Sequence, residues 1–485
     1  MTDKLPPQVR ATVAGMAWPA LPSRHATHCL ALLYQLEHSQ WLPAGELVNH
    51  QFRQINLVLR HAFETVPHYR ARAAEWGIDP DRAMTVEEFR HRVPVLRRAE
   101  IQELGDELLS AEIPQSHGKT GAVLTSGSTG RPIKVVKTEL TETFWNALTV
   151  RDHLWRRDPN QKLASIRPLS GTKAPYPEGI MFKDWGGMTA LAFTNGASAL
   201  LNIGTRIQDQ VEWLQRFDPD YLLTYPGNIQ AIAIHCEREG IRFPRLKQIH
   251  TVSDLLRPEV RKICREVFDV PVIDAYSSAE TGYIALQCPA SENLHIQSES
   301  VFVEVLGEDG EECRPGEVGE VVITPLHNFA MPLLRYAIGD FAEVGNCVCG
   351  RSLPVLKRIM GRTRSMVRLP NGDEFYASFQ DLLTGFDMIR QFQVVRLGAE
   401  ALEMKLVAVR ELSAAEAERL TEILRQRFRH PFAVSFSYHD DIPRSAGGKF
   451  EATRTKASRY KGQTQRIIGI ETAVMRISSG RPMRQ

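Results

Sequence analysis

The sequence predicts an α/β protein of two or three domains. Between about residues 157 and 345, short apolar runs alternate with stretches of helical period, which indicates a largely buried sheet flanked by helices. A shorter α/β pattern returns at residues 390–440, after a segment rich in glycine, cysteine and basic residues at 345–362. The length of 485 residues agrees with this division.

Composition excludes several classes of protein. The chain has 59 Lys and Arg against 57 Asp and Glu, a net charge of +2, and this balance argues against binding to a nucleic-acid backbone. Seven cysteines, an odd number, do not make a disulfide scaffold. The N-terminus lacks the apolar run of a secretory signal, and no stretch approaches the roughly 18–20 apolar residues of a membrane span. We therefore expect a cytoplasmic protein that is not bound to a membrane.

Individual elements follow from periodicity and from proline. An amphipathic helix is expected from about residue 49, broken at Val66-Pro67, because a residue before proline avoids the helical region. A second helical region at 86–110 is divided at Pro94, and residues 1–45 give mixed signals that indicate a loosely packed lead-in. Further helices are expected at 139–156 and 414–428, and strands at 197–203, 222–225, 248–252, 270–275, 301–306, 318–324, 392–395 and 402–409.

The sharpest local feature is the loop Leu124-Thr-Ser-Gly-Ser-Thr-Gly-Arg-Pro-Ile-Lys134 between two strand-like flanks. Its glycines and hydroxyls can present backbone N–H groups and side-chain oxygens together to a cluster of anionic oxygens. The order of a Walker A loop is absent. Composition alone fits a flexible hairpin loop as well as a phosphate cradle.

Five motifs occur in order along the chain: the loop 125–134, Asp274-Ala-Tyr-Ser-Ser-Ala-Glu-Thr-Gly282, Leu334-Arg-Tyr-Ala-Ile-Gly-Asp340, Gly361-Arg362 and Pro443-Arg-Ser-Ala-Gly-Gly-Lys449. Together they resemble the signatures of the adenylate-forming enzymes, a superfamily of acyl-CoA synthetases, adenylation domains and luciferases. The segments 61–70, 93–98 and Thr224-Tyr-Pro-Gly227 resemble its phenylacetate–CoA ligase branch. The resemblance covers about residues 48–450.

The resemblance implies both a fold and a reaction. It implies a lead-in at 1–47, a large multi-sheet adenylation domain at 48–361, a small mobile α+β lid domain at 362–450 and a basic tail at 451–485. The implied reaction is ATP- and Mg²⁺-dependent activation of an aromatic or compact carboxylic acid as an acyl-adenylate, with release of pyrophosphate and transfer to CoA. Transfer of the acyl group to an acceptor other than CoA would place the reaction in a biosynthetic pathway.

The resemblance also assigns roles to single residues. Glu280 would hold Mg²⁺ on the phosphates, since a carboxylate oxygen suits a hard cation, and the mobile Lys449 would contact the attacking carboxylate and the α-phosphate. Tyr276 would stack near the adenine, and Ser277 would also contact the nucleotide. Asp340 would accept hydrogen bonds from both ribose hydroxyls, and Arg362 would lie near the ribose and phosphates. The alternatives are a surface glutamate at 280 and a helix cap at 340. The phosphate loop would comprise Thr125, Ser126, Gly127, Ser128, Thr129, Gly130 and Lys134, and the acyl pocket would include Tyr225, Pro226 and Gly227.

The region after Gly361-Arg362 departs from the family pattern. Arg364 or Ser365 stands where the family usually has an acidic pivot residue, and the following segment 368–376 also differs. In the family this region swings the small domain toward thioester formation, so the departure bears on the CoA step. An alternative acceptor is an amine, a carrier-protein thiol or another nucleophile. A third hypothesis, a non-catalytic nucleotide-binding scaffold, is opposed by the retained Glu280, Asp340 and Lys449.

A cysteine–histidine set has the composition of a metal site. Cys288 and His295 are followed by the C-x-C pair Cys347 and Cys349, which gives three thiolates and one imidazole, a suitable set for a tetrahedral structural zinc. Some members of the phenylacetate–CoA ligase branch are similar here. The alternative is four unrelated residues. The sequence leaves the oligomeric state open, with a dimer as one option.

Overall fold

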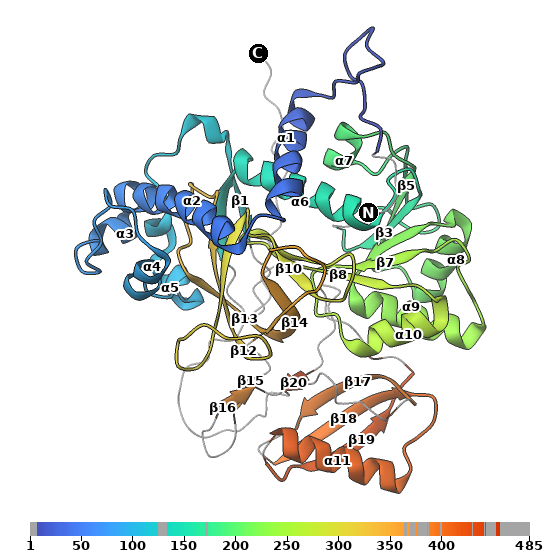
Figure 1. Cartoon of the computed structure of the whole chain (residues 1–485). Helices are drawn as coiled ribbons and strands as arrows, with labels where there is room; N and C mark the ends of the chain where they lie inside the picture. Colours follow the sequence, from blue (N-terminus) through green and yellow to red (C-terminus); the bar gives the residue numbers. More distant parts are fainter. Residues whose placement is uncertain are drawn as a thin grey trace, which may run out of the picture.

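The computed structural model describes residues 7–124, 133–169, 173–362, 366–368, 374–376, 386, 388–397, 400–428, 430–440, 442 and 453–455. Its large part carries a long, strongly curved sheet with helices on both sides, and a smaller part lies below it in Figure 1. The predicted α/β class, with a separate C-terminal unit, is confirmed.

The helices are α1 (Arg24–Ser39), α2 (Ala44–Thr65), α3 (Pro67–Arg72), α4 (Val86–Arg92), α5 (Arg98–Leu104), α6 (Glu139–Arg156), α7 (Gly187–Ala192), α8 (Ile207–Phe217), α9 (Pro226–Glu239), α10 (Pro258–Phe268) and α11 (Ala414–Phe428), with short 3₁₀ turns at Gly105–Leu108 and Gln115–His117. Val66 is extended and Pro67 opens α3, as expected from the Val-Pro step. The helices predicted at 139–156 and 414–428 are α6 and α11.

The strands are β1 (Thr120–Leu124), β2 (Lys134–Thr138), β3 (Leu163–Arg167), β4 (Ile180–Phe182), β5 (Ser198–Asn202), β6 (Tyr221–Thr224), β7 (Gln248–Thr251), β8 (Val272–Ser278), β9 (Gly282–Gln287), β10 (Leu294–Ile296), β11 (Val301–Leu306), β12 (Val318–Pro325), β13 (Tyr336–Gly345), β14 (Val355–Arg362), β15 (Met366–Arg368), β16 (Glu374–Tyr376), β17 (Ile389–Arg396), β18 (Ala401–Ala408), β19 (Ala433–Tyr438) and β20 (Thr453–Thr455). Each strand expected from an apolar run has a counterpart among them.

Twelve strands form one sheet, in the order β11-β12-β13-β14-β10-β9-β8-β7-β6-β3-β5-β4. From β5 to β8 the neighbours run parallel, and from β8 to β11 they run antiparallel. Strand β8 therefore belongs to both halves. Ligands of open α/β sheets bind beyond the carboxyl ends of parallel strands, and the carboxyl end of β8 lies where the two halves meet.

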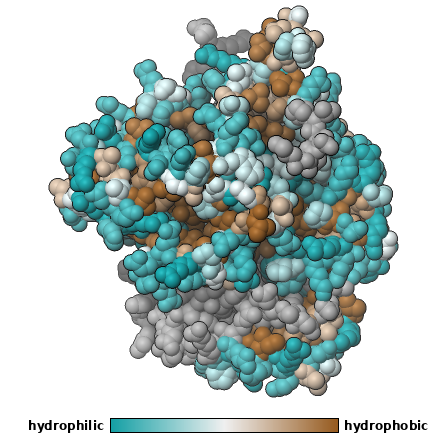
Figure 2. Space-filling view, in the orientation of Figure 1, coloured by the Kyte–Doolittle hydropathy of each residue, from teal (hydrophilic) through white to brown (hydrophobic). Residues whose placement is uncertain are grey.

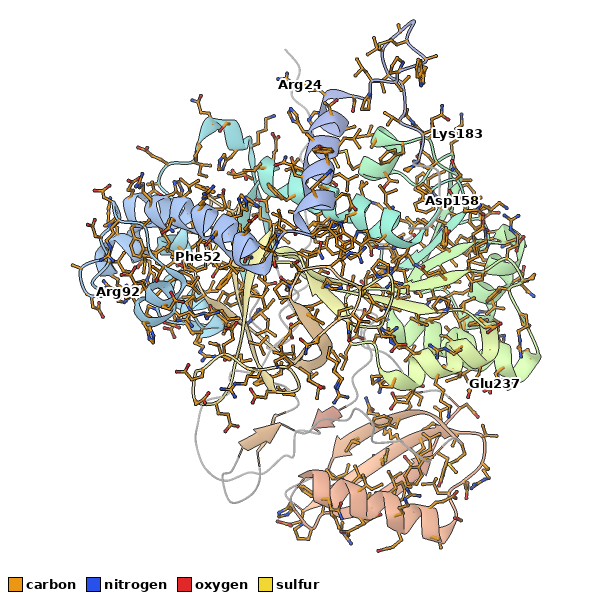
Figure 3. The ribbon with its side chains drawn as sticks, viewed as in Figure 1. Arg24, Phe52, Arg92, Asp158, Lys183 and Glu237 are labelled. Atoms are coloured by element: carbon orange, nitrogen blue, oxygen red, sulfur yellow. The ribbon has the colours of Figure 1, made fainter. Side chains whose placement is uncertain are left out.

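Each half has its own hydrophobic core. The parallel half packs against α8, α9 and α10, and the antiparallel half packs against α2 to α5. Phe52 on α2, labelled in Figure 3, contacts the rings of Phe89 and Phe302 edge-on. Outside these cores, the face shown in Figure 2 is mostly hydrophilic, with scattered hydrophobic patches.

The lead-in is more ordered than its sequence indicated. Helix α1 packs against α6 and α7, with Cys29 and Leu36 in a shared apolar cluster. Arg151 of α6 is fully buried, donates to the Leu36 carbonyl oxygen at 2.7 Å and pairs with Glu299 at 3.3 Å. The sequence pattern did not predict α1, because only a narrow stripe of small and apolar residues on this helix is buried against another helix.

The smaller part contains a four-stranded sheet in the order β19-β18-β17-β20, with α11 against it and a core of its own. Arg257 at the start of α10 lies over the ring of Phe392 of β17, with 5.4 Å from the guanidinium carbon to the ring centroid. This contact joins the small part to the parallel half. All seven cysteines are free thiols. Among the described helices, none has both the length and the apolar composition of a membrane span.

Candidate functional site

Tyr276 and Asp340 meet at the centre of the candidate site. The Tyr276 hydroxyl, from β8, donates to Asp340 Oδ2, from β13, at 2.8 Å, and both residues are buried. In the sheet order β14, β10 and β9 separate these two strands, and neighbouring strands lie about 4.8 Å apart. A flat sheet would hold the two residues far apart, so the direct contact shows that the sheet curls here. The curl creates a concave face lined by β8 and β13.

Glu280 lies in the turn between β8 and β9 and is only 3% exposed. Its Oε1 accepts a hydrogen bond from the Tyr336 hydroxyl at 3.5 Å and lies 3.4 Å from Arg98 Nη1. This environment excludes the surface-glutamate alternative. A buried carboxylate needs such partners, because desolvation of an unpaired charge is costly.

The turn that carries Glu280 requires glycine at position 282. Gly282 has a φ of +96°, and a Cβ there would lie 2.9 Å from a ring carbon of Trp145. Trp145 of α6 also stacks on Tyr283, with ring centroids 4.6 Å apart. Helix α6 therefore packs directly on the turn and fixes the position of Glu280.

The structure places some of the other expected nucleotide-binding residues. Arg362, at the end of β14, is the backbone partner of Asp340 in the antiparallel ladder, and Ser277 follows Tyr276 on β8. Asp340 lies within β13, which excludes the helix-cap alternative. Lys134 begins β2, is exposed and lies 3.9 Å from Asp106 Oδ1. The phosphate-loop residues Thr125 to Gly130, Arg364, Ser365 and Lys449 lie outside the described residues.

The expected acyl-pocket residues lie at the carboxyl end of β6. Tyr225 is the half-buried residue before α9, Pro226 opens that helix and Gly227 is buried within it. Strand β6 is two strands away from β8 in the sheet order. These residues can therefore flank the same edge of the sheet as Tyr276, consistent with an adjacent pocket.

Asp274 is a titratable group next to this edge. Burial of the carboxyl raises its pKa to about 7, and the Arg261 guanidinium, the Ala275 N–H and the Thr251 hydroxyl oppose part of the rise. The negative charge of Asp254 acts in the same direction as burial. The carboxyl accepts hydrogen bonds from Ala275 N at 3.0 Å and from Thr251 Oγ1 at 3.3 Å. Asp274 thus lies two residues from Tyr276 with its carboxyl near its protonation midpoint at neutral pH.

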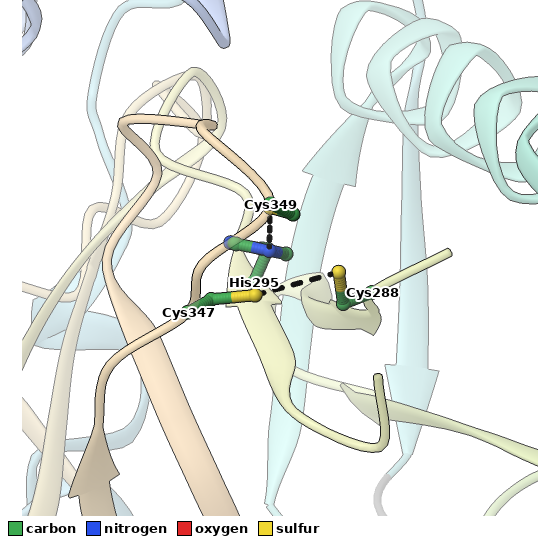
Figure 4. A group of neighbouring side chains, drawn as sticks. All are labelled: Cys288, His295, Cys347 and Cys349. Carbon is green, nitrogen blue, oxygen red and sulfur yellow. Dashed lines mark hydrogen bonds between the residues drawn. The ribbon is translucent and has the colours of Figure 1, made fainter. Parts of the chain in front are cut away.

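The candidate metal centre is assembled as its sequence pattern predicts. The ligand atoms of Cys288, His295, Cys347 and Cys349 all lie within 4.8 Å of one another (Figure 4). Cys349 Sγ is 3.2 Å from His295 Nε2, and Cys347 Sγ is 3.6 Å from Cys288 Sγ. Thiolates bound tetrahedrally to zinc are roughly 3.8 Å apart, given Zn–S bonds of about 2.3 Å. The geometry therefore fits one tetrahedral ion.

A further hydrogen bond orients the histidine of this cluster. His295 Nδ1 lies 3.1 Å from the Leu353 carbonyl oxygen, so a proton on Nδ1 leaves Nε2 facing the three sulfur atoms. The alternative of four unrelated residues is not compatible with this convergence. Cys288 directly follows β9, and Cys347 and Cys349 lie in the loop between β13 and β14. The sheet brings these two segments together.

Two residues at Glu280 were missed by sequence reasoning as site residues. Arg98 ends the segment 93–98, which carried the resemblance to the phenylacetate–CoA ligase branch, and Tyr336 lies inside the motif that ends at Asp340. Both therefore lay in recognised motifs. Only the fold shows that they point to Glu280.

Two family models and several known proteins match parts of this chain. The family described as AMP-binding enzyme matches residues 113–330, and the family described as CapK C-terminal domain matches residues 375–456. A phenylacetate–coenzyme A ligase of Thermus thermophilus is 24% identical over 86% of this chain and 98% of its own length. The phenylacetate–coenzyme A ligase of Escherichia coli is 22% identical over 85% of this chain and 96% of its own.

Among solved structures, a 2-hydroxyisobutyryl-CoA ligase in its postadenylation state superimposes with a TM-score of 0.67. The two share 19% sequence identity, over 86% of this chain and 91% of the other. At that identity the likeness establishes a common fold.

Proposed function

Because the chain belongs to the adenylate-forming superfamily and is similar to its phenylacetate–CoA ligase branch, we propose that it activates a carboxylic acid with ATP and Mg²⁺. The carboxylate oxygen bonds to the α-phosphorus, the bond to the β-phosphate bridging oxygen breaks, and pyrophosphate leaves. The acyl group then passes from AMP to the thiol of CoA. The relatives favour an aromatic or compact acid.

One observation carries the proposal: the hydroxyl of Tyr276 and the buried carboxylate of Asp340 meet where β8 and β13 face each other. Asp340 retains an oxygen for a ribose hydroxyl, and Tyr276 offers a ring face at the adenine position. An ATP molecule whose adenosine binds there would direct its phosphates toward the β8–β9 turn. That turn carries Glu280.

The chain's own residues would perform most of the work, since catalysis of this transfer is mainly orientation and charge neutralisation. Glu280 would hold Mg²⁺, which neutralises phosphate charge when bound, and the loop of Thr125 to Gly130 would hold the phosphates. Lys449 would bring a positive charge to the α-phosphate and the attacking carboxylate. These three roles are proposals from the family pattern.

The test is carboxylate-dependent exchange of labelled pyrophosphate into ATP over a broad panel of aromatic, short-chain and hydroxylated acids. We expect exchange with at least one acid, and its loss in Lys449→Ala. Arg410→Ala is a matched control, because Arg410 pairs with Glu416 on the exposed surface of the small domain. A panel without any exchange would overturn the adenylation proposal, and unchanged exchange in Lys449→Ala would overturn the role of Lys449.

An acceptor other than CoA is the alternative, and it is favoured by Arg364 and Ser365 at the domain junction, where the family usually has an acidic residue. In this version the acyl group passes from the adenylate to an amine, a carrier-protein thiol or another nucleophile of a biosynthetic pathway. Adding CoA to the exchange-positive acid separates the two versions. Acyl-CoA formation supports the first version, and exchange without any acyl-CoA supports the second.

We also propose that Cys288, His295, Cys347 and Cys349 bind a structural zinc ion. Three sulfur atoms and one imidazole fill a tetrahedral shell and leave no open position, which is typical of structural sites. The ion would tie the loop between β13 and β14 to β9. No step of the proposed reaction passes through it.

A further inference from the structure

Arg98 stands out because it is a cation held against the carboxylate proposed to bind Mg²⁺. Its Nη1 lies 3.4 Å from Glu280 Oε1, and its side chain is 21% exposed while that of Glu280 is 3% exposed. Glu280 also accepts a hydrogen bond from the Tyr336 hydroxyl, and the half-buried Lys137 ammonium interacts with it electrostatically. Arg98 therefore forms an ion pair with Glu280 and is the more solvent-accessible member of that pair.

The backbone before Arg98 is fastened to β13. Leu96 forms a parallel bridge with Tyr336, through Leu96 N to the Arg335 oxygen and Ala337 N to the Leu96 oxygen, both at 3.0 Å. The Arg335 guanidinium, held by Glu304 at 3.0 Å, also donates to the Val93 carbonyl oxygen at 2.8 Å. A buried network thus fixes the point from which the Arg98 side chain extends.

We propose that Arg98 is a binding residue for the β- and γ-phosphates of ATP, and for the pyrophosphate that leaves. This inference rests on the proposed function. Before the nucleotide binds, Arg98 neutralises the buried carboxylate of Glu280. When the Mg²⁺-bound triphosphate occupies the site, Glu280 has a new cationic partner, and the Arg98 guanidinium turns to the phosphate oxygens beside it.

The chemistry of the guanidinium suits this exchange of partners. Its planar set of N–H donors matches both carboxylate and phosphate oxygens, and it stays protonated in either state. Because the side chain is partly exposed, it can rotate without unfolding helix α5. The adenine and ribose would lie at Tyr276 and Asp340, and they do not need this cation.

The experiment measures binding of three probes without a carboxylic acid, so that no turnover occurs. MgATP, Mg-pyrophosphate and AMP are titrated into the wild type, Arg98→Gln, Arg98→Lys and Arg97→Gln by calorimetry. Arg97 is the matched control because it is the adjacent arginine, its side chain is 54% exposed and it pairs with Glu320 instead of Glu280. Melting temperatures verify that each variant is folded.

We expect Arg98→Gln to weaken MgATP and Mg-pyrophosphate about tenfold or more, since a charge-assisted hydrogen bond is lost, and to leave AMP within twofold. Arg98→Lys should restore part of the loss, and Arg97→Gln should resemble the wild type. Equal weakening of AMP and MgATP would show a structural role for Arg98 and overturn the inference, as would unchanged MgATP binding. A wild type that binds neither MgATP nor AMP would instead overturn the proposed function, and with it this inference.

Discussion

The pair of Tyr276 and Asp340 makes the sharpest prediction about nucleotide binding. If Asp340 accepts hydrogen bonds from the ribose, Asp340→Asn should weaken AMP and ATP to the same extent, because both contain that ribose. The asparagine keeps an oxygen that can accept from the Tyr276 hydroxyl, now 2.8 Å from Asp340 Oδ2, so the side-chain packing is preserved. What is lost is the negative charge.

The size of the loss follows from the contacts. A hydrogen bond to a charged group contributes about 1.5–3 kcal/mol, and a neutral one about 1 kcal/mol. Replacing the charged acceptor of a ribose hydroxyl by an amide should therefore cost about 0.5–2 kcal/mol, which weakens AMP about 2- to 30-fold. Tyr276→Phe removes only the hydroxyl that orients Asp340 and keeps the ring, so it should cost about 1 kcal/mol, roughly fivefold in affinity.

The assay is calorimetric titration of AMP and MgATP into the two variants and the wild type at one fixed salt concentration, with circular dichroism as the test of folding. AMP binding to Asp340→Asn within twofold of the wild type would refute the reasoning. A loss confined to MgATP would also refute it, because that pattern belongs to Arg98 and the terminal phosphates. Asp340→Asn and Arg98→Gln thus test two different parts of the nucleotide, the ribose and the terminal phosphates.

Three further predictions concern the metal, the domain contact and pH. Protein purified without chelator should carry about one zinc per chain by elemental analysis. Cys349→Ser should lose the zinc, and Cys313→Ser, which lies outside the cluster, should keep it. A wild type that is folded but metal-free would contradict the site. Arg257→Ala should loosen the small part and raise the radius of gyration in X-ray scattering, since a desolvated cation–π contact contributes about 2 kcal/mol; an unchanged radius would contradict the contact's role. Burial raises the pKa of Asp274 to about 7, so the folded state binds its proton more tightly than the unfolded state and loses stability as pH rises from about 4 to 7. Asp274→Asn should therefore gain melting temperature relative to the wild type over that range and level off above pH 8, and a difference independent of pH would exclude the shift.

Local elements could be predicted from the sequence because their signals are local. Helices α6 and α11 follow from apolar residues at helical spacing, and the end of α2 follows from the restriction that Pro67 imposes on Val66. The strands of the parallel half are short apolar runs buried on both faces. None of these signals depends on a distant partner.

The spatial neighbours of the site could not be derived in the same way. The contact of Tyr276 with Asp340 depends on the curl of a sheet in which three strands separate β8 from β13. Sequence reasoning reached these two residues through their motifs, and it missed Arg98 because the bridge of Leu96 with Tyr336 is a tertiary contact without a local pattern. The motifs therefore identified the functional residues themselves, but they did not identify Arg98 as the ion-pair partner of Glu280.

The N-terminal helix and the cysteine–histidine cluster belong to one structural unit that supports the site. Arg351, two residues after Cys349, donates to Gln40 Oε1 at 2.6 Å and lies over the rings of Trp41 and Trp155, each 4.8 Å from its guanidinium carbon. The loop between β13 and β14, which carries Cys347 and Cys349, therefore contacts the C-terminal ends of α1 and α6.

Helix α6 connects this structural unit to the turn that carries Glu280. At one end Trp155 lies under Arg351, and two turns or more earlier Trp145 presses on Gly282 and Tyr283, next to Glu280. Arg151, between them, is fully buried and fixes α1 to the same helix through Leu36. A helix restrained at three points along its length has little freedom to shift, so the turn that packs against it holds Glu280 in one place. The cysteine–histidine cluster and α1 thus support the position of Glu280 through the packing of α6.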